Sequence, residues 1–354
     1  MNIYDTFFML AAVTEQPRMP TFFRNRYFPT NVNLDILGTA RVFVDFREGN
    51  RKLAPFVVPR IRGVSIMREG FETHELEPPN ISLSRTLTVD NLKARGFGES
   101  LLSNMTPADR ERALLLEDLR ELSNRISARE EWMSAETILN NGCVMKHITD
   151  REDVAFEEIE ARFYSGDDNP TLFTPQRPWR EGSSSWRYDI REMARTLRKR
   201  GLPATDLVIT RDVEDFIMRD EWLLKLLDIQ RVEIGQINPR ELPDGTTYIG
   251  RLNFSGVNLN ILVHDWAYED ENGNDVYFLP EGTVIVTAPR CGRTLYGGVT
   301  QMEDDNNFHT HAGSRVPKFD ADKKHNAKEI TLTSKPLMAP RRKDPWMVAK
   351  NVFN

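Results

Sequence analysis

The longest regular segment of this chain reads TPADRERALLLEDLRELSNRISAREEWMSAETILNNG, at residues 106–142. It opens with the signals of a helix start: Thr106 as N-cap, Pro107 at the first helical position and Asp109 three residues after the cap. Neither glycine nor proline occurs again before Gly142, which we expect to end the helix. The sequence therefore predicts one helix over 107–141, roughly 50 Å long.

One face of this predicted helix is apolar. Its apolar residues recur every three or four positions, as Leu115, Leu119, Leu122, Ile126 and Met133 do. A coiled coil is the weaker alternative, because the stripe lacks a sustained pair of apolar positions in each heptad. The pattern places these residues on one face of a single long helix.

Downstream of the helix the pattern changes to strands. Residues 143–164 read as strands around a turn at 149–153, and 165–188 form a connector rich in glycine, proline and serine that indicates a domain boundary. The order helix, strand, helix and then strands describes an α+β domain. We expect helices at 188–200 and 212–227, strands at 207–210, 246–254, 259–266, 276–279 and 283–288, and a hairpin turn at 270–274.

The last part of the chain is polar before it becomes apolar again. After Gly297 and Gly298, a stretch of mixed charge to Lys328 is expected to be an extended surface loop. Strands are expected at 330–333 and 347–352. Because terminal strands need a sheet to pair with, we expect both to return to the domain that holds the long helix.

Two segments upstream of the helix lack a core of their own. Residues 1–40 carry many aromatic residues interrupted by prolines, which indicates an arm that lies either on a neighbouring copy or on its own domain. Residues 41–77 hold alternating blocks at 41–46 and 56–61 around a turn signal at 48–50, so they read as a long two-stranded excursion. A lone hairpin is marginal in water, which favours support from a neighbour.

The composition is that of a globular protein without an overall attraction to nucleic acid. The chain has 354 residues, 40% hydrophobic and 28% charged, and its formal net charge is -6. Cys143 and Cys291 lack the spacing of a disulfide framework or a zinc site. No apolar run reaches the roughly 18–20 residues that span a bilayer, so neither secretion nor membrane insertion is expected.

The sequence offers no recognisable catalytic chemistry. It lacks the motifs of phosphate-binding loops, nucleophile elbows, zinc proteases and EF-hands. His264 reads as a partly buried side chain, and His309 and His311 read as solvated ones. The basic runs at 199–200 and 341–343 read as solvated ends or subunit contacts. We therefore predict no enzyme activity, no cofactor and no metal.

Four stretches carry a resemblance to a known family. They are FFRNRYF at 22–28, the segment 79–99 with DNL at 90–92, FLPEGT at 278–283 leading to TLYG at 294–297, and SKPLM at 334–338 followed by DP at 344–345. In their order and spacing the chain resembles the major capsid proteins of tailed bacteriophages, and among these the lambda-type major head proteins. The resemblance covers nearly the full length.

The resemblance implies an α+β chain with the HK97-like capsid fold. The axial domain of this fold would face the centre of a ring of subunits. The expected parts are an N-terminal arm (1–40), an extended loop (41–80), a peripheral domain (81–184) with the spine helix (107–141), an axial domain (185–300), and an extended segment with return strands to the peripheral domain (301–354).

The function implied by the resemblance is structural. The chain would assemble with copies of itself into hexamers and pentamers that close into an icosahedral head around double-stranded DNA. Its other partners would be portal, scaffold and decoration proteins, and it would contact the packaged DNA without sequence specificity and bind no membrane. It would reside in the virion after assembly in the host cytoplasm.

A closed shell requires each subunit to donate surface to the next, and the arm and the hairpin are the projecting elements. We hypothesise that Arg51, Arg60 and Arg62 of the hairpin meet acidic residues of an adjacent subunit. The candidate acids on the helix are Glu117, Asp118 and Glu121, and the candidate contacts of the arm are Phe22 and Phe23.

Three alternatives remain open. The same fold could serve an encapsulin-like cellular shell, which co-purifying cargo protein and the absence of DNA-filled heads would reveal. An enzyme using the cleft between the two domains has no positive residue evidence, and a discrete monomer with a bound small ligand would favour it. A non-specific DNA-binding protein is disfavoured by the net acidity.

Overall fold

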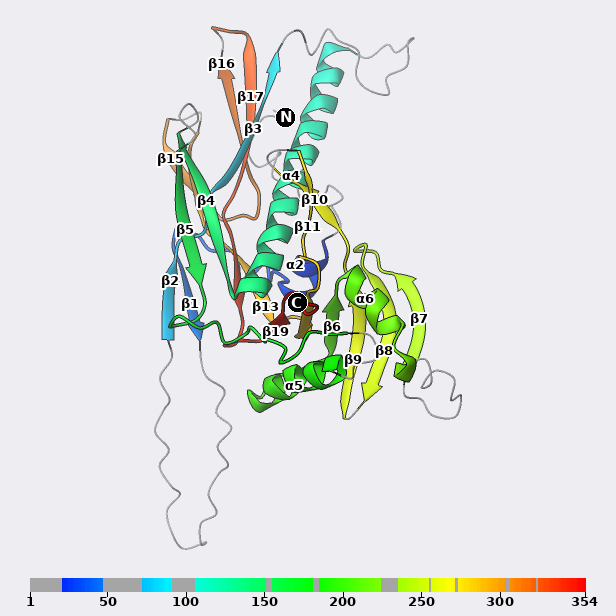
Figure 1. Ribbon diagram of the computed structural model, residues 1–354. Coiled ribbons are helices and arrows are strands. Elements are labelled where there is room, and N and C mark those ends of the chain that lie inside the picture. Colours follow the sequence, from blue (N-terminus) through cyan, green and yellow to red (C-terminus); the bar gives the residue numbers. More distant parts are fainter. Residues whose placement is uncertain are drawn as a thin grey trace, which may run out of the picture.

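The structure of the chain is a computed structural model, shown in Figure 1. It describes residues 21–46, 72–88, 90, 106–150, 155–180, 185–223, 235–254, 256–270, 273–303, 306–322 and 324–354. The turn predicted at 48–50 and the strand block predicted at 56–61 lie outside these residues.

The helix α4, Pro107–Asn140, confirms the predicted long helix. Its N-terminus is a capping box: the Asp109 amide donates to Thr106 Oγ1 at 3.2 Å, and the Thr106 amide donates to Asp109 Oδ2 at 3.3 Å. Its other end differs from the prediction. Asn141 takes the left-handed conformation (φ 52°) that terminates the helix, while Gly142 already begins the next strand. Asparagine tolerates this conformation better than other residues with a side chain.

The predicted apolar stripe is largely the buried face of α4. It packs on a three-stranded antiparallel sheet of β3 (Ile81–Thr88), β16 (Val316–Asp322) and β17 (Ala327–Ser334), in the order β16-β17-β3 (Figure 1). Four residues of the stripe and two of β17 form a separate core. These are Leu115, Leu119, Leu122, Ile126, Ile330 and Leu332.

Three antiparallel pairs lie around the lower end of α4 in Figure 1. They are β1 (Val42–Phe46) with β2 (Glu72–Leu76), β4 (Gly142–Asp150) with β5 (Ala155–Arg162), and β13 (Gly292–Tyr296) with β18 (Pro336–Pro340). The β4–β5 pair confirms the strands predicted after the helix. The strand predicted at 41–46 pairs with residues 72–76, whereas the sequence suggests the block at 56–61 as its partner.

The second part of the fold is a six-stranded sheet with α5 (Ser185–Lys199) and α6 (Arg211–Met218). This confirms the predicted α+β order, although α6 ends well before residue 227. Asp220 accepts the Trp222 amide at 2.8 Å and so offers the backbone a local turn beyond the helix. The strands are β6 (Asp206–Ile209), β7 (Gly235–Glu241), β8 (Thr247–Phe254), β9 (Val257–Val263), β12 (Val284–Thr287) and β19 (Met347–Ala349), in the order β19-β12-β6-β9-β8-β7.

The central strands of this sheet bury both faces. Leu207 and Ile209 of β6 pack in one core with residues of α5 and α6, whereas Val208 between them packs in another core with the C-terminal part of α4. Leu262 of β9 and Ile285 of β12 repeat this alternation on the α4 side. The sheet therefore separates two hydrophobic cores, and both helices cover the same face.

The region predicted as an extended surface loop instead contains strands. β14 (Val299–Met302) pairs with β15 (Phe308–His311), and β16 pairs with β17. All of β15 and the second half of β16 are exposed or half-buried, so no alternation of apolar residues marked them as strands. The hairpin predicted around 270–274 is present, but its strands are the short β10 (Ala267–Glu269) and β11 (Asp275–Tyr277).

The two C-terminal strands separate, which corrects the prediction that both return to the domain of the long helix. β17 does pack on α4, but β19 pairs with β12 of the six-stranded sheet. Met347 and Ala349 lie in the core of α5 and α6, while Val348 faces the other core. The strand goes to the sheet edge at which its apolar residues on both sides are buried.

No helix in the part of the chain that the structure describes is long and apolar enough to cross a membrane. Cys143 and Cys291 are both free thiols. Burial raises the pKa of each to about 12, so neither is a thiolate at neutral pH.

Candidate assembly elements

The arm helix α2, Phe22–Tyr27, docks on α4 of the same chain (Figure 1). Glu131 of α4 accepts three backbone N–H groups at the start of α2. Phe22 and Phe23 donate to its Oε1 at 2.9 and 2.6 Å, and Arg24 donates to its Oε2 at 3.0 Å. The first N–H groups of a helix have no partner within it, and a carboxylate also matches the positive end of the helix dipole. Burial raises the pKa of Glu131 to about 7, against the opposing effect of these donors.

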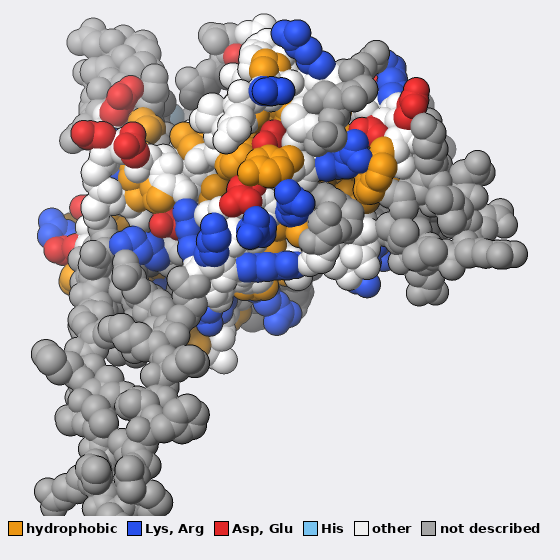
Figure 2. All heavy atoms as spheres, turned by 60° about the horizontal axis from the view of Figure 1, so that its bottom comes forward, with side chains coloured by type: hydrophobic (Ala, Val, Ile, Leu, Met, Phe, Trp, Pro, Cys, Tyr) orange, Lys and Arg blue, Asp and Glu red, His pale blue; other side chains and the backbone are white. Residues whose placement is uncertain are grey.

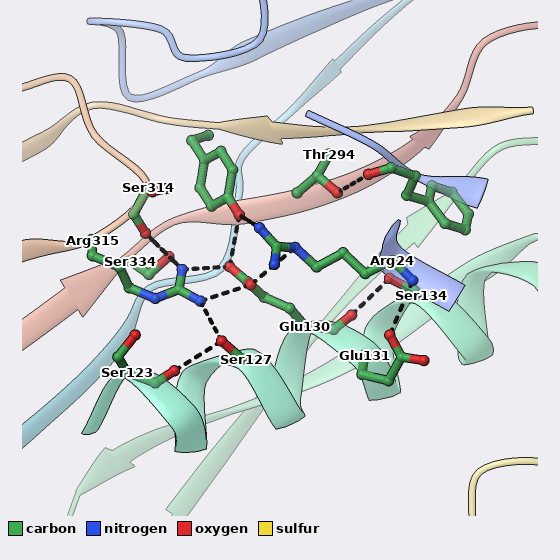
Figure 3. A network of polar contacts seen from close by, with 12 residues as sticks. Arg24, Ser123, Ser127, Glu130, Glu131, Ser134, Thr294, Ser314, Arg315 and Ser334 are labelled. Atoms are coloured by element: carbon green, nitrogen blue, oxygen red, sulfur yellow. Dashed lines mark hydrogen bonds and ion pairs between the residues drawn. The ribbon is translucent and has the colours of Figure 1, made fainter. Parts of the chain in front are cut away.

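The neighbouring Glu130 is fully buried and binds side chains from distant segments (Figure 3). Arg315 donates to both of its oxygens, at 2.7 and 2.8 Å. The Tyr296 hydroxyl donates to Oε1 at 3.0 Å, and Arg24 Nε lies 3.3 Å from Oε2. Burial alone would raise the pKa of Glu130, but the guanidinium groups of Arg315 and Arg24 lower it below its ordinary value.

The remaining donors of this network are directed to neutral oxygens. Arg315 also donates to Ser127 Oγ at 3.1 Å and to Ser334 Oγ at 3.3 Å, and Arg24 donates to the Tyr296 hydroxyl at 2.9 Å. Figure 3 shows how these side chains converge between α4 and the strands above it. The network can fix the arm, α4, β13 and the segment entering β16 in one arrangement, which is a structural rather than a chemical task.

The arm is also joined to the six-stranded sheet. Arg26 Nε lies 2.6 Å from Asp206 Oδ2 at the start of β6, and the Tyr27 hydroxyl donates to the same oxygen at 3.2 Å. Burial raises the pKa of Tyr27 well above its ordinary value, and the adjacent Asp206 adds to the effect. The arm therefore links α4 to the second part of the fold.

Phe22 and Phe23, the hypothesised contacts of the arm, lie inside the core of their own chain. They are 1% and 0% exposed, and their ring centroids are 5.4 and 4.8 Å from that of His264. For residues 22–28 the structure thus has the second of the two arrangements left open, docking on the same chain. A contact between these rings and another copy would require α2 to leave this position.

His264 and His311 take part in separate local contacts. Burial lowers the pKa of His264 to about 4, which keeps its ring neutral among the aromatic side chains. His311 Nε2 lies 2.6 Å from Glu303 Oε1. Across the described ranges, no group of three or more His, Cys, Asp or Glu side chains could hold a metal ion.

The acids proposed on α4 differ in their availability. Arg85 of β3 lies 2.8 Å from Asp118 and 2.6 Å from Glu121, so two of the three are already paired within the chain. Burial raises the pKa of Asp118, whereas the hydrogen bond from Arg85 lowers that of Glu121. Glu117 is exposed. It is the candidate that the structure leaves at the surface.

The β1–β2 pair flanks the predicted excursion on both sides in the chain. Val42 and Val44 are buried in the core, whereas Phe43 on the opposite side of the strand is 60% exposed. Arg41 Nη1 pairs with Glu75 Oε1 across the two strands at 3.0 Å. The hypothesised contact residues of the excursion, Arg51, Arg60 and Arg62, lie outside the described residues.

The buried network was missed by the sequence reasoning. One signal could have found it: Glu130 lies four residues after Ile126 and three before Met133, so a carboxylate occupies a position on the apolar stripe. A charge at such a position needs buried partners. Nothing in the sequence identifies Arg315 as that partner, because the two residues are 185 positions apart.

Comparison with known proteins adds an independent finding. A model of the family described as phage major capsid protein E matches residues 6–351. The chain is 22% identical to the major capsid protein of Enterobacteria phage P21 over 364 residues, which cover 99% of each, and 22% identical to that of Escherichia phage lambda over 344 residues, which cover 96% of each. Among solved structures, the putative capsid protein of a prophage of E. coli CFT073 has a TM-score of 0.64 at 16% identity, with 99% of both chains covered.

Proposed function

This chain belongs to the phage major capsid protein E family, and from that premise we propose that it is the subunit from which an icosahedral bacteriophage head is built. The observation that carries the proposal is the extent of the likeness, because the family match runs over residues 6–351 and the shared fold spans 99% of both chains. The α+β architecture is the HK97-like capsid fold that the sequence motifs implied. The likeness thus extends over nearly the whole chain and is not confined to one shared module.

Hexamers and pentamers of this chain are the proposed building units. Each contact in such a ring joins two different surfaces of identical subunits, so each subunit must reach onto the next. The β1–β2 pair supports this role, because Val42 and Val44 anchor it in the core while Phe43 faces outward. We assign the extended loop, residues 41–80, to contact with the adjacent subunit.

The proposed domains follow the two parts of the fold. Residues 81–184 form the peripheral domain around the spine helix α4, and residues 185–300 with the six-stranded sheet form the axial domain that faces the ring centre. The pairing of β19 with β12 moves the chain end from the peripheral to the axial domain. Within the proposed arm, residues 1–40, helix α2 contacts both parts through Glu131 and Asp206.

The further partners follow from the role of a head subunit. The inner surface of the shell contacts packaged double-stranded DNA without sequence specificity, and portal, scaffold and decoration proteins bind elsewhere on the shell. Assembly takes place in the host cytoplasm, and the role is structural and not enzymatic. The encapsulin-like alternative is not favoured, because the family and the relatives named above are those of phages.

Negative-stain electron microscopy with mass photometry tests this function. The chain is expressed alone and together with its neighbouring genes, and closed shells or rings of five and six subunits are the expected result. A monomer or dimer that persists under both conditions would contradict the capsid role and restore the enzyme alternative. Shells that hold a cargo protein and never DNA would favour the encapsulin-like role.

A further inference from the structure

Basic residues are the commonest kind on the solvent side of α5: Arg195, Arg198 and Lys199 are exposed, and Arg187 and Arg191 are half-buried. At 100° per residue, Arg187, Arg191, Arg195 and Arg198 fall within an arc of about 80° of the helix circumference. The adjoining face is apolar and packs in the core of the six-stranded sheet. That face consists of Trp186, Ile190, Met193, Ala194 and Leu197.

The tertiary structure adds a second basic segment to this face. Arg200, just after α5, donates to the Asp344 carbonyl at 3.2 Å and to the Pro170 carbonyl at 2.7 Å. This places the end of α5 beside the turn that carries Arg341, Arg342 and Lys343. Figure 2 brings the end of the molecule at which α5 lies forward and shows Lys and Arg side chains gathered across it. We call Arg187, Arg191, Arg195, Arg198, Lys199, Arg341, Arg342 and Lys343 the basic patch.

The ordinary solvated face of an amphipathic helix does not account for the patch. Cations stabilise the C-terminal end of a helix through its dipole, which explains Arg198 and Lys199. The same dipole disfavours Arg187 in the first turn of α5, which contains no acid, and does nothing to favour Arg191 in the second turn. Selection for helix stability alone would place acids there.

The two acids of α5 leave most of this charge uncompensated. Asp189 is buried and accepts the Trp179 indole N–H at 2.8 Å. Glu192 lies 3.4 Å from Arg195 and 3.7 Å from Lys199. Neither Arg187 nor Arg191 forms an ion pair with any residue that the structure describes.

Aromatic rings hold these two arginines in place instead. The guanidinium of Arg187 lies 4.5 Å from the ring centroid of Trp222, and that of Arg191 lies 5.2 Å from that of Tyr188. Stacking restricts the side chains before any ligand arrives, so less conformational entropy is lost on binding. Arg187 and Arg191, which are ordered and have no acidic partner among the described residues, therefore fit an anionic surface.

We propose that the basic patch is the surface through which the subunit contacts the phosphate backbone of double-stranded DNA; this inference rests on the proposed function of the chain as a head subunit. From Arg187 to Arg198 the row on α5 is about 16 Å long. Duplex DNA carries one negative charge per about 1.7 Å of its axis, so a rigid row of this length meets several phosphates in any sequence. The patch thus supplies locally the attraction that the net charge of -6 opposes.

The test compares two triple variants of the full-length protein. Arg191, Arg195 and Arg198 are replaced by Gln in the first, and Arg112, Arg120 and Arg125, which are exposed on α4, are replaced by Gln in the second. Both lose the same charge. Binding of a labelled linear duplex of random sequence to purified subunits is measured against salt concentration, and thermal melting reports folding.

The patch variant is expected to bind the duplex more weakly and to lose about 2–3 from the slope of log K against log salt, because each phosphate contact contributes about 0.9. The α4 variant is expected to keep the slope of the unmodified protein. If the patch variant does not fold, Arg342→Gln in the exposed turn is expected to lose about 1 from the slope.

Two results would overturn the inference. The first is equal binding by the unmodified protein and the patch variant. The second is that the unmodified protein binds no duplex at low salt. If the patch variant then also fails to assemble, the patch is a contact with an acidic protein surface. Electron microscopy of the unmodified protein distinguishes failure of this inference from failure of the proposed function. Shells without DNA binding would leave the proposed function standing and remove only the patch.

Discussion

Arg315 and Glu130 form a bidentate ion pair, with Nη1 to Oε1 at 2.7 Å and Nη2 to Oε2 at 2.8 Å, between residues 185 positions apart (Figure 3). The arginine stands directly before β16, and the glutamate lies in the C-terminal half of α4. Both side chains are buried, at 8% and 0% exposure. One contact thus holds the segment that enters β16 against the spine helix.

Arg315→Met should lower the free energy of unfolding by about 3 kcal/mol or more, because removing one partner leaves a buried carboxylate with fewer counter-charges. Urea denaturation of the unassembled subunit measures this. Arg125→Met is the control, since Arg125 pairs with Glu121 at the surface and should cost less than about 1 kcal/mol. Equal losses in the two variants would contradict the role assigned to the Glu130 network.

Glu131 should make the stability of the subunit depend on pH near neutrality. Its pKa is raised from 4.5 to about 7 by burial, so the folded chain binds a proton more tightly than the unfolded chain does. The stability that this proton contributes is complete below about pH 4 and is lost as the pH rises through 7, a change of about 3 kcal/mol. Glu131→Gln removes the titration and serves as the reference.

The measurement is urea denaturation of both proteins between pH 5 and 8, a range that brackets the shifted pKa. The difference in unfolding free energy should move in favour of Glu131→Gln as the pH rises. Parallel profiles for the two proteins would show that Glu131 keeps an ordinary pKa and that the N–H groups of α2 outweigh its burial.

Gly292→Ala should destabilise the docking of the arm. A Cβ at this position would overlap the ring of Phe28 and approach the Ala339 carbonyl oxygen to 3.0 Å. Phe28 is fully buried, so its ring has no space to move into. We expect a loss of about 1–3 kcal/mol.

The matched control for this substitution is Gly38→Ala. No heavy atom lies within 4 Å of a Cβ at Gly38, so thermal melting should change little there. If Gly292→Ala melts at the same temperature as Gly38→Ala, the close contact between Phe28 and β13 does not limit the packing of the arm.

Arg60→Glu should impair assembly without unfolding the subunit, if the extended loop meets the acidic side of α4 on a neighbour. The structure singles out Glu117 as the partner to test, because Asp118 and Glu121 are occupied by Arg85. Adding Glu117→Lys should restore shells by reversing both charges. Shells are observed by negative-stain microscopy, and circular dichroism reports folding.

Adding Glu121→Lys to Arg60→Glu provides the comparison for this charge exchange. It should not restore shells, because it places a second cation beside Arg85. Normal shells from Arg60→Glu alone would show that the extended loop does not use this contact. Rescue by Glu121→Lys and not by Glu117→Lys would show that the loop contacts Glu121 rather than Glu117.

Local features of the sequence determined the long helix, the α+β order of elements in residues 185–300 and the family. Thr106 and Asp109 encode the start of α4 within one turn, and the apolar stripe encodes its buried face. Such signals can be read because capping and periodicity depend on residues a few positions apart. The family motifs are likewise contiguous stretches, and their order follows the chain.

The tertiary structure alone decided which distant residues meet. It pairs β19 with the six-stranded sheet and Arg315 with Glu130, and it places the 341–343 turn beside the end of α5. None of these contacts has a local signal, because the free energy of each arises only when packing brings together side chains far apart in the chain. Each helix or strand is encoded by residues close together in the chain. How these elements combine is selected by the burial of apolar faces and the pairing of buried charges.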